Sequence, residues 1–142
     1  MTTRVEWGLL IGRLILGITM FAHGIQKFMM MDMMVGMFTD MFGLPGFMAY
    51  VTAIIETVAG LAIILGLFVE ISAIFLGLIM LGAIFTVKLP MVGFFGNGQM
   101  AGYELDLALL GLSVILAVAG SRMFAVSSLF SNQKTQVKTV NT

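Results

Sequence analysis

Apolar residues dominate four stretches of the chain, and polar residues mark the ends of each stretch. The stretches cover roughly residues 7–28, 47–68, 71–89 and 103–120. Each is close to the ~20 residues that an α-helix needs to cross the hydrocarbon core of a bilayer. The pattern therefore predicts an all-α protein, an integral membrane four-helix bundle whose connecting segments lie outside the hydrocarbon.

The segment between the first two stretches is rich in methionine. Four methionines recur at the spacing of one helix face: Met30, Met34, Met37 and Met41. With polar residues on the opposite side, this pattern predicts a short interfacial helix that ends at the Gly-Leu-Pro-Gly sequence of residues 43–46. Thioether sulfurs also suit Cu(I), but no histidine interleaves the run and methionine is an adaptable apolar filler. We predict no metal site, and copper binding stays open as the alternative.

Composition agrees with a membrane protein. Of 142 residues, 60% are hydrophobic and 10% are charged, whereas soluble domains carry about 25% charged residues. The formal net charge of zero argues against a nucleic-acid partner. Because the chain has no cysteine, it cannot form disulfides, thiolate metal sites or a dithiol redox centre. Electrons, if the protein handles them, must come from a cofactor, a substrate or a partner.

The chain is predicted to form one transmembrane domain, residues 1–130, followed by a polar cytoplasmic tail, residues 131–142. The basic residues near the two ends of the chain are Arg4, Arg122, Lys134 and Lys138. Only Lys27 and Lys88 lie in or beside the segments on the opposite side. Because cytoplasmic loops carry the excess of Lys and Arg, both termini are predicted to be cytoplasmic.

Ionisable residues interrupt all four apolar stretches. A charge at the centre of a span costs about 2.5–3.5 kcal/mol on insertion scales, so such residues usually face the interior of a bundle. In each stretch the charge shares a helix face with small residues, which mark close packing in membranes. The four faces are Arg13, Gly17, Met20, Gly24 and Lys27; Ala49, Ala53, Glu56, Gly60 and Ile63; Ala73, Gly77, Ile84 and Lys88; and Glu104, Ala108, Gly111 and Ile115. These faces are predicted to meet in one shared interior.

Arg13 and Glu56 lie nearest the centre of the membrane. The long arginine side chain brings them within reach of each other, which predicts an interior ion pair. Such a pair can fix the register of two helices or take part in function.

A second group of charges lies at the ends of the spans that are remote from the termini: His23, Lys27, Lys88 and Glu104. The group predicts a polar pocket beneath the 89–103 loop. Asp106 is about 200° from Glu104 at 100° per residue and is predicted to face away from it. The alternative for the lysines is that they extend to lipid headgroups.

Three segments resemble the DoxX family of small four-helix membrane proteins: GRLILGITMFAHGIQKF, IETVAGLAIILGLF and VGFFGNGQMAGYELDLALL. The resemblance covers roughly residues 8–120 and implies a multi-pass protein of the bacterial or archaeal inner membrane. Family members are often described as oxidoreductases, with links to quinones and to the detoxification of oxidants or catechol-like compounds. The family's characteristic positions fall here on Arg13, His23-Gly24, Lys27, Glu56 and Gly102-Tyr103-Glu104.

The residues and the resemblance together predict a quinone-linked oxidoreductase, or a subunit of a membrane redox or detoxification complex. The expected catalytic residues are His23, Lys27 and Glu104, and the expected ligand-binding residues are Lys88, Asn97 and Tyr103. No cofactor is expected in the chain itself apart from a bound quinone. Expected partners are the lipid bilayer, a quinone-like small molecule, a soluble redox partner and a second copy of the chain. The alternatives are a small-molecule carrier or binding protein and a membrane anchor for a soluble enzyme.

Overall fold

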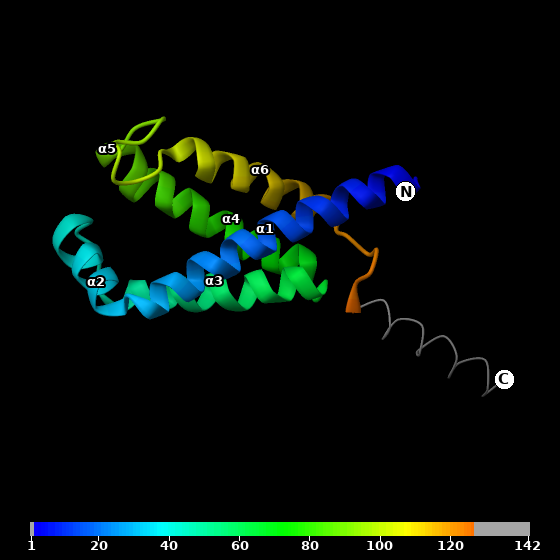
Figure 1. Cartoon of the computed structure of the whole chain (residues 1–142), viewed down its shortest axis with the longest axis horizontal. Coiled ribbons are helices and arrows are strands. Elements are labelled where there is room, and N and C mark those ends of the chain that lie inside the picture. The colour runs from blue at the N-terminus through cyan, green and yellow to red at the C-terminus, as the bar shows by residue number, and fades with distance from the viewer. Residues whose placement is uncertain (1, 127–142) are drawn as a thin grey trace.

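The computed structural model describes residues 2–126, and every element in this part of the chain is helical (Figure 1). The elements are α1 (Thr3–Met29), α2 (Met31–Gly36), the π-helical turn η1 (Met37–Met41), α3 (Phe47–Leu65), α4 (Val69–Ala83), the π-helical turn η2 (Ile84–Lys88), α5 (Leu89–Met91) and α6 (Tyr103–Ala119). The predicted tail, residues 131–142, lies outside the described residues. The all-α prediction is confirmed for the described part of the chain.

Within the described residues, three helices are long and apolar enough to cross a membrane. They are Thr3–Met29, Phe47–Leu65 and the continuous run Val69–Met91, which contains α4, η2 and α5. The fourth long helix, α6, has 17 residues. The chain is therefore a helical membrane protein by the length and composition of its helices, and the crossing of α6 stays a prediction.

A tight turn joins α3 to α4. Helix α3 ends at Leu65 because Gly66 adopts a φ of 71°, a left-handed conformation that glycine reaches without strain from a side chain. The Gly66 amide donates to the carbonyl oxygen of Ile63 at 3.1 Å, and α4 begins three residues later at Val69. The two helices consequently form an antiparallel hairpin, with α1 packed against α3 and α6 packed against α4 (Figure 1).

Glycines allow α1 and α3 to approach closely. A Cβ atom added at Gly17 would lie 3.0 Å from the carbonyl oxygen of Gly60, and one added at Gly24 would lie 2.6 Å from the backbone nitrogen of Thr57. Small residues at such crossings let two backbones pack with little intervening side chain. This crossing brings the end of α1 that carries Lys27 against the middle of α3.

The predicted inward faces of the first three long helices agree with the buried positions. The buried members are Arg13, Gly17, Met20 and Gly24 in α1; Ala49, Ala53, Glu56, Gly60 and Ile63 in α3; and Ala73, Gly77 and Ile84 in α4 and η2. A hydrophobic core joins these faces and includes Leu16, Ile63 and Leu76, all with 0% exposure.

The predicted inward face of α6 is wrong. Its buried residues are Asp106, Leu109, Ser113 and Leu116. Gly111 has open space beyond its Cα, whereas a Cβ on Gly77 of α4 would lie 3.5 Å from the Cβ of Ser113. Ala108 and Gly111 thus lie on the outer side of α6, because α4 packs against the Ser113 face instead.

Candidate functional site

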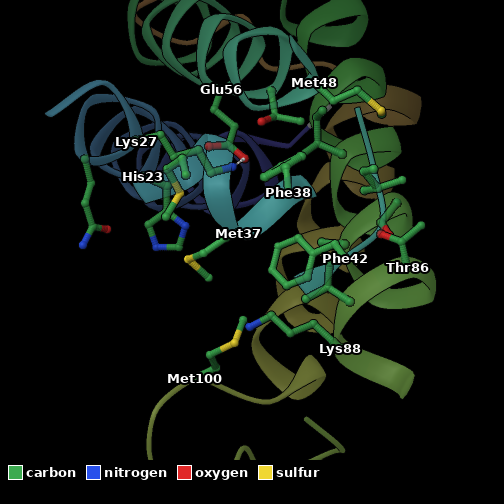
Figure 2. Close-up of a pocket in the computed structure, with 18 of the residues that line it drawn as sticks. His23, Lys27, Met37, Phe38, Phe42, Met48, Glu56, Thr86, Lys88 and Met100 are labelled. Atoms are coloured by element: carbon green, nitrogen blue, oxygen red, sulfur yellow. Dashed lines mark hydrogen bonds and ion pairs between the residues drawn. The ribbon is translucent and has the colours of Figure 1, made fainter. Parts of the chain in front are cut away.

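A cavity of about 480 Å³ lies among α1, the α2–η1 segment, α3 and the α4–η2 run (Figure 2). Its apolar lining is mainly thioether, aromatic and aliphatic: Met30, Met34, Met37, Phe38, Phe42, Leu44, Met48, Leu78, Ile79, Gly82, Ala83, Val87 and Met100. Its polar lining is His23, Gln26, Lys27, Thr52, Glu56, Thr86 and Lys88. A volume within the range of about 300–1,000 Å³, with few polar groups in an apolar wall, is typical of small-molecule sites.

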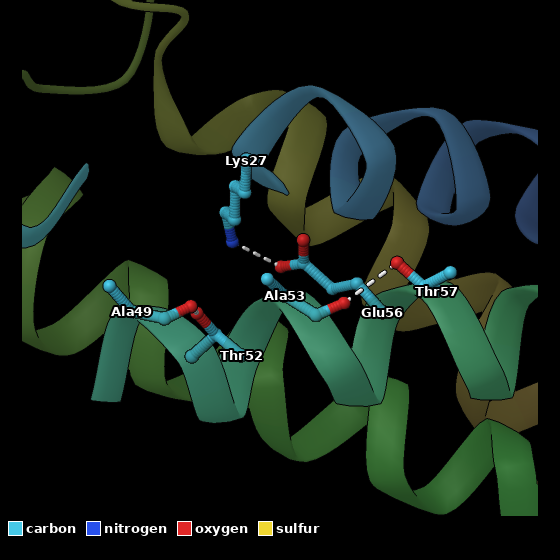
Figure 3. A network of polar contacts seen from close by, with 6 residues as sticks. All are labelled: Lys27, Ala49, Thr52, Ala53, Glu56 and Thr57. Atoms are coloured by element: carbon cyan, nitrogen blue, oxygen red, sulfur yellow. Dashed lines mark hydrogen bonds and ion pairs between the residues drawn. The ribbon is translucent and has the colours of Figure 1, made fainter. Parts of the chain in front are cut away.

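Lys27 and Glu56 form an ion pair on the wall of this cavity (Figure 3). The Lys27 Nζ donates to Glu56 Oε1 at 2.5 Å, and the side chains are 22% and 2% exposed. The second carboxylate oxygen, Oε2, is buried and has no hydrogen-bond partner within residues 2–126. Burial of a polar atom without a partner is destabilising, so this oxygen carries an energetic cost in the fold.

The threonines beside Glu56 do not donate a hydrogen bond to this oxygen. Thr57 donates to the carbonyl oxygen of Ala53 at 2.8 Å, and Thr52 donates to the carbonyl oxygen of Ala49 at 3.1 Å (Figure 3). Both hydroxyl groups thus bond back to their own helix, a common arrangement for threonine in helices.

The predicted ion pair between Arg13 and Glu56 is corrected by the structure. Arg13 is 1% exposed, and its guanidinium donates to three backbone carbonyl oxygens after α6, those of Ser121, Met123 and Phe124, at 3.1–3.3 Å. Lys27 takes the place of Arg13 beside Glu56 because the glycine crossing aligns the end of α1 with the middle of α3. Arg13 is 14 residues earlier, about 21 Å along an ideal helix, and reaches the other end of the bundle.

Lys88 pairs with the α6 carboxylate that was predicted to face away. Its Nζ donates to the carbonyl oxygen of Ala101 at 2.5 Å and lies 3.7 Å from Asp106 Oδ2. Asp106 is 9% exposed. Glu104 does not line the cavity; it lies beside Gly102 at the start of α6, and its buried Oε2 has no hydrogen-bond partner in the described part of the chain. The rotation of α6 thus places Asp106, rather than Glu104, beside Lys88.

Asn97 and Tyr103 are not among the cavity residues. The Asn97 Oδ1 accepts hydrogen bonds from the amides of Gln99 and Met100 at 3.2 and 3.0 Å, which folds the loop before α6. The Tyr103 ring packs edge-on against Phe94, with centroids 5.1 Å apart. Ligand binding by these two residues remains a prediction to which the cavity adds no support.

The structure adds residues of the methionine-rich segment to the site. Phe38 of η1 is 9% exposed, and its ring packs edge-on against Phe42 at 5.6 Å on the cavity wall. The methionine face from Met30 to Met37 lines the same cavity. The helical methionine spacing was the signal for this face, but amphipathicity alone does not say whether a face covers lipid or a cavity.

Charge in the cavity region is balanced pair by pair. Lys27 faces Glu56 and Lys88 faces Asp106, and His23 lies within electrostatic range of both carboxylates. The sequence predicted several cations around one carboxylate, which would favour an anion. Two neutralised pairs favour instead an uncharged ligand that carries hydrogen-bonding oxygens.

These features define the class of the molecule, a small helical membrane protein with an amphipathic cavity. The DoxX family model matches residues 8–89, a range that includes most of α1 and all of α3, α4 and η2. The chain belongs to the DoxX family, as the resemblance of its sequence motifs predicted.

Two known proteins are similar to this chain over most of their length. The chain is 41% identical over 126 residues to the protein named "Putative oxidoreductase CatD" of Bacillus subtilis (strain 168), a match that covers 89% of each chain. It is 33% identical over 115 residues to "Uncharacterized membrane protein Rv3486" of Mycobacterium tuberculosis (strain ATCC 25618 / H37Rv), covering 73% of this chain and 70% of the relative. No solved structure matches the chain.

Proposed function

We propose that this DoxX protein binds a quinone-like ring in the cavity and acts as the membrane subunit of a quinone-linked oxidoreductase. The observation that carries the proposal is the Lys27–Glu56 ion pair, which places polar groups on the wall of a cavity with an otherwise mainly apolar lining. The relative named as an oxidoreductase supports the redox class.

The residues of the cavity fit such a ring. Methionine and phenylalanine side chains form favourable contacts with an aromatic or quinonoid face, and methionine adapts to rings of different substitution. Lys27 lies toward one end of the cavity and Lys88 toward the other, with Phe38 and Phe42 between them (Figure 2). Oxygens at two positions on a ring can therefore each meet an ammonium donor.

A bound quinone would accept two electrons and two protons. The ammonium groups of Lys27 and Lys88 donate hydrogen bonds toward ring oxygens and stabilise negative charge that develops there. Glu56 can hold a proton on Oε2 while Oε1 keeps its bond to Lys27, which suits a residue that passes protons. Because the chain has no cysteine, we expect a soluble redox partner to deliver the electrons.

The proposal also assigns four spans in the inner membrane, with both termini in the cytoplasm and the α2–η1 segment at the interface. Helix α6 supports a fourth span because it packs along α4 and turns apolar residues outward, among them Val114, Ile115 and Val118. Its 17 residues lie at the short end of the range of about 17–25 for transmembrane helices.

Quinone binding by the purified, detergent-solubilised protein tests the proposed function. We expect saturable retention of a short-chain benzoquinone by the protein on gel filtration. K27M and K88M should each weaken binding at least tenfold, about 1.4 kcal/mol. R4M removes an exposed cation outside the cavity, so it is the matched control and should bind as the wild type does. Absence of quinone binding by the wild type would overturn the proposal, and binding without quinone reduction in the presence of a redox partner would favour the carrier alternative.

A further inference from the structure

The cavity holds thioether and imidazole donor atoms whose lone pairs the proposed quinone chemistry does not use. Met30, Met34 and Met37 follow one another at helical spacing through the end of α1, α2 and η1, and all three line the cavity. His23, the only histidine in the chain, lines it too, so the imidazole and the three thioethers share one cavity (Figure 2). The fold thus supplies the histidine that is missing from the methionine run in the sequence.

The chemistry of these donors selects a particular class of metal ion. Thioether sulfur binds soft ions such as Cu(I), and imidazole nitrogen is a good ligand for copper. Hard divalent ions prefer carboxylates, and the described residues contain no group of three or more His, Asp or Glu that could hold a metal. The cavity carboxylate, Glu56, already accepts the ammonium of Lys27. The remaining donors are neutral and soft, which suits a monovalent ion.

Electrostatics around the donors does not oppose a monovalent cation. Lys27 and Lys88 lie at the cavity, but each has a carboxylate partner, Glu56 and Asp106 respectively. The cavity is therefore not a cationic field that would exclude a positive ion.

Six of the seven methionines at positions 29–41 form two sets of three, and Met31 belongs to neither. Met30, Met34 and Met37 line the cavity, with Met30 39% exposed, whereas Met29, Met33 and Met41 do not line it and are 81%, 54% and 52% exposed. Filling apolar space requires no histidine beside the methionines, whereas a metal site does require convergent donors. The outer set gives an internal control of equal size and composition.

We propose that His23, Met30, Met34 and Met37 form a Cu(I) site on the wall of the cavity. The site uses imidazole and thioether lone pairs, whereas the quinone proposal rests on the hydrogen-bonding groups of Lys27, Lys88 and Glu56, although both occupy the same cavity. No electron transfer by the metal is part of the proposal.

The test is a titration of the full-length, detergent-solubilised protein with Cu(I) under anaerobic, reducing conditions, in competition with a chromogenic Cu(I) chelator. Ag(I) serves as a second probe that does not change oxidation state. We expect one equivalent of tightly held ion in the wild type. The triple variant M30L/M34L/M37L and the single variant H23F should each weaken retention at least tenfold, while M29L/M33L/M41L should retain the ion as the wild type does. Leucine is close to methionine in volume, so the fold should tolerate both triple variants.

Each outcome decides the question. Equal loss in the two triple variants, or no retention by the wild type, overturns the site. X-ray absorption of the copper complex should show sulfur and nitrogen neighbours, and oxygen neighbours alone would overturn the assignment. Quinone binding is measured separately on metal-free protein, so failure of the copper site and failure of the quinone proposal are distinguishable.

Discussion

The guanidinium of Arg13 donates a hydrogen bond to the carbonyl oxygen of Met123 at 3.1 Å, linking the first long helix to the segment that follows α6. Two further carbonyl oxygens, of Ser121 and Phe124, accept from the same group. The planar guanidinium can serve several acceptors at once, which a lysine ammonium cannot do with the same fixed geometry. Arg13 therefore closes the end of the bundle opposite the cavity.

Replacement of Arg13 by methionine should destabilise this end of the bundle. Loss of the donor removes one buried and two partly buried hydrogen bonds, so we expect the free energy of unfolding to fall by about 1–3 kcal/mol. R13K keeps the charge but not the planar donor set, so its stability should lie between those of the wild type and R13M. Thermal unfolding in detergent measures the effect, and an R13M protein as stable as the wild type would contradict the assigned hydrogen bonds.

Double-mutant cycles should separate the observed ion pair from the one that the sequence predicted. Lys27 and Glu56 are in direct contact, so K27M or E56Q alone should lower the free energy of unfolding. The loss should lie toward the lower end of about 3–5 kcal/mol, because the Lys27 side chain is 22% exposed. The stability loss of the K27M/E56Q protein should be smaller than the sum of the losses of the two single variants. Arg13 and Glu56 share no partner, so the stability losses of R13M and E56Q should be additive to within about 0.5 kcal/mol. Coupling between Arg13 and Glu56, with none between Lys27 and Glu56, would support the ion pair that the sequence predicted.

The glycine crossing predicts a large effect from a single methyl group. In G24A the new Cβ meets the Thr57 side chain and backbone, so α1 and α3 must move apart, at a cost of about 1–3 kcal/mol. The matched control is G111A, whose Cβ meets nothing within 4 Å and which should be neutral or stabilising by up to about 1 kcal/mol. Unfolding in detergent again provides the measurement. Equal stability of the two variants would mean that the helices do not cross at Gly24.

The sequence predicted the inward faces of α1, α3 and α4 because their small residues meet one another across helix crossings. It failed for α6, where Ala108 and Gly111 turn outward and Ser113 packs against Gly77. A helix that is apolar on all sides has no polar face to fix its rotation, so periodicity offers several candidate faces. Only the position of the partner helix selects among them.

The candidate site was partly predictable for a related reason. Placing charges by depth grouped His23, Lys27 and Lys88, and these three residues line one cavity in the structure. Their partners were not predictable, because a charge in one helix can meet charges of similar depth in several others, and small rotations decide which. Glu56 was assigned to Arg13 and Asp106 was turned outward, yet these carboxylates are the partners of Lys27 and Lys88.

Cysteine accessibility should establish the topology and decide whether α6 crosses the membrane. The natural chain has no cysteine, so each introduced thiol reports one position. Exposed positions at Thr39 and Asn97 follow α1 and α4, and T39C and N97C should both react with an impermeant reagent in intact cells. T2C, before α1, should react only after permeabilisation, as should a cysteine appended after Thr142 if α6 is a fourth span. Labelling of the appended cysteine in intact cells, with T39C and N97C also labelled, would leave three spans. Labelling of T2C instead of T39C would invert the orientation, because the positive-inside argument would then have failed.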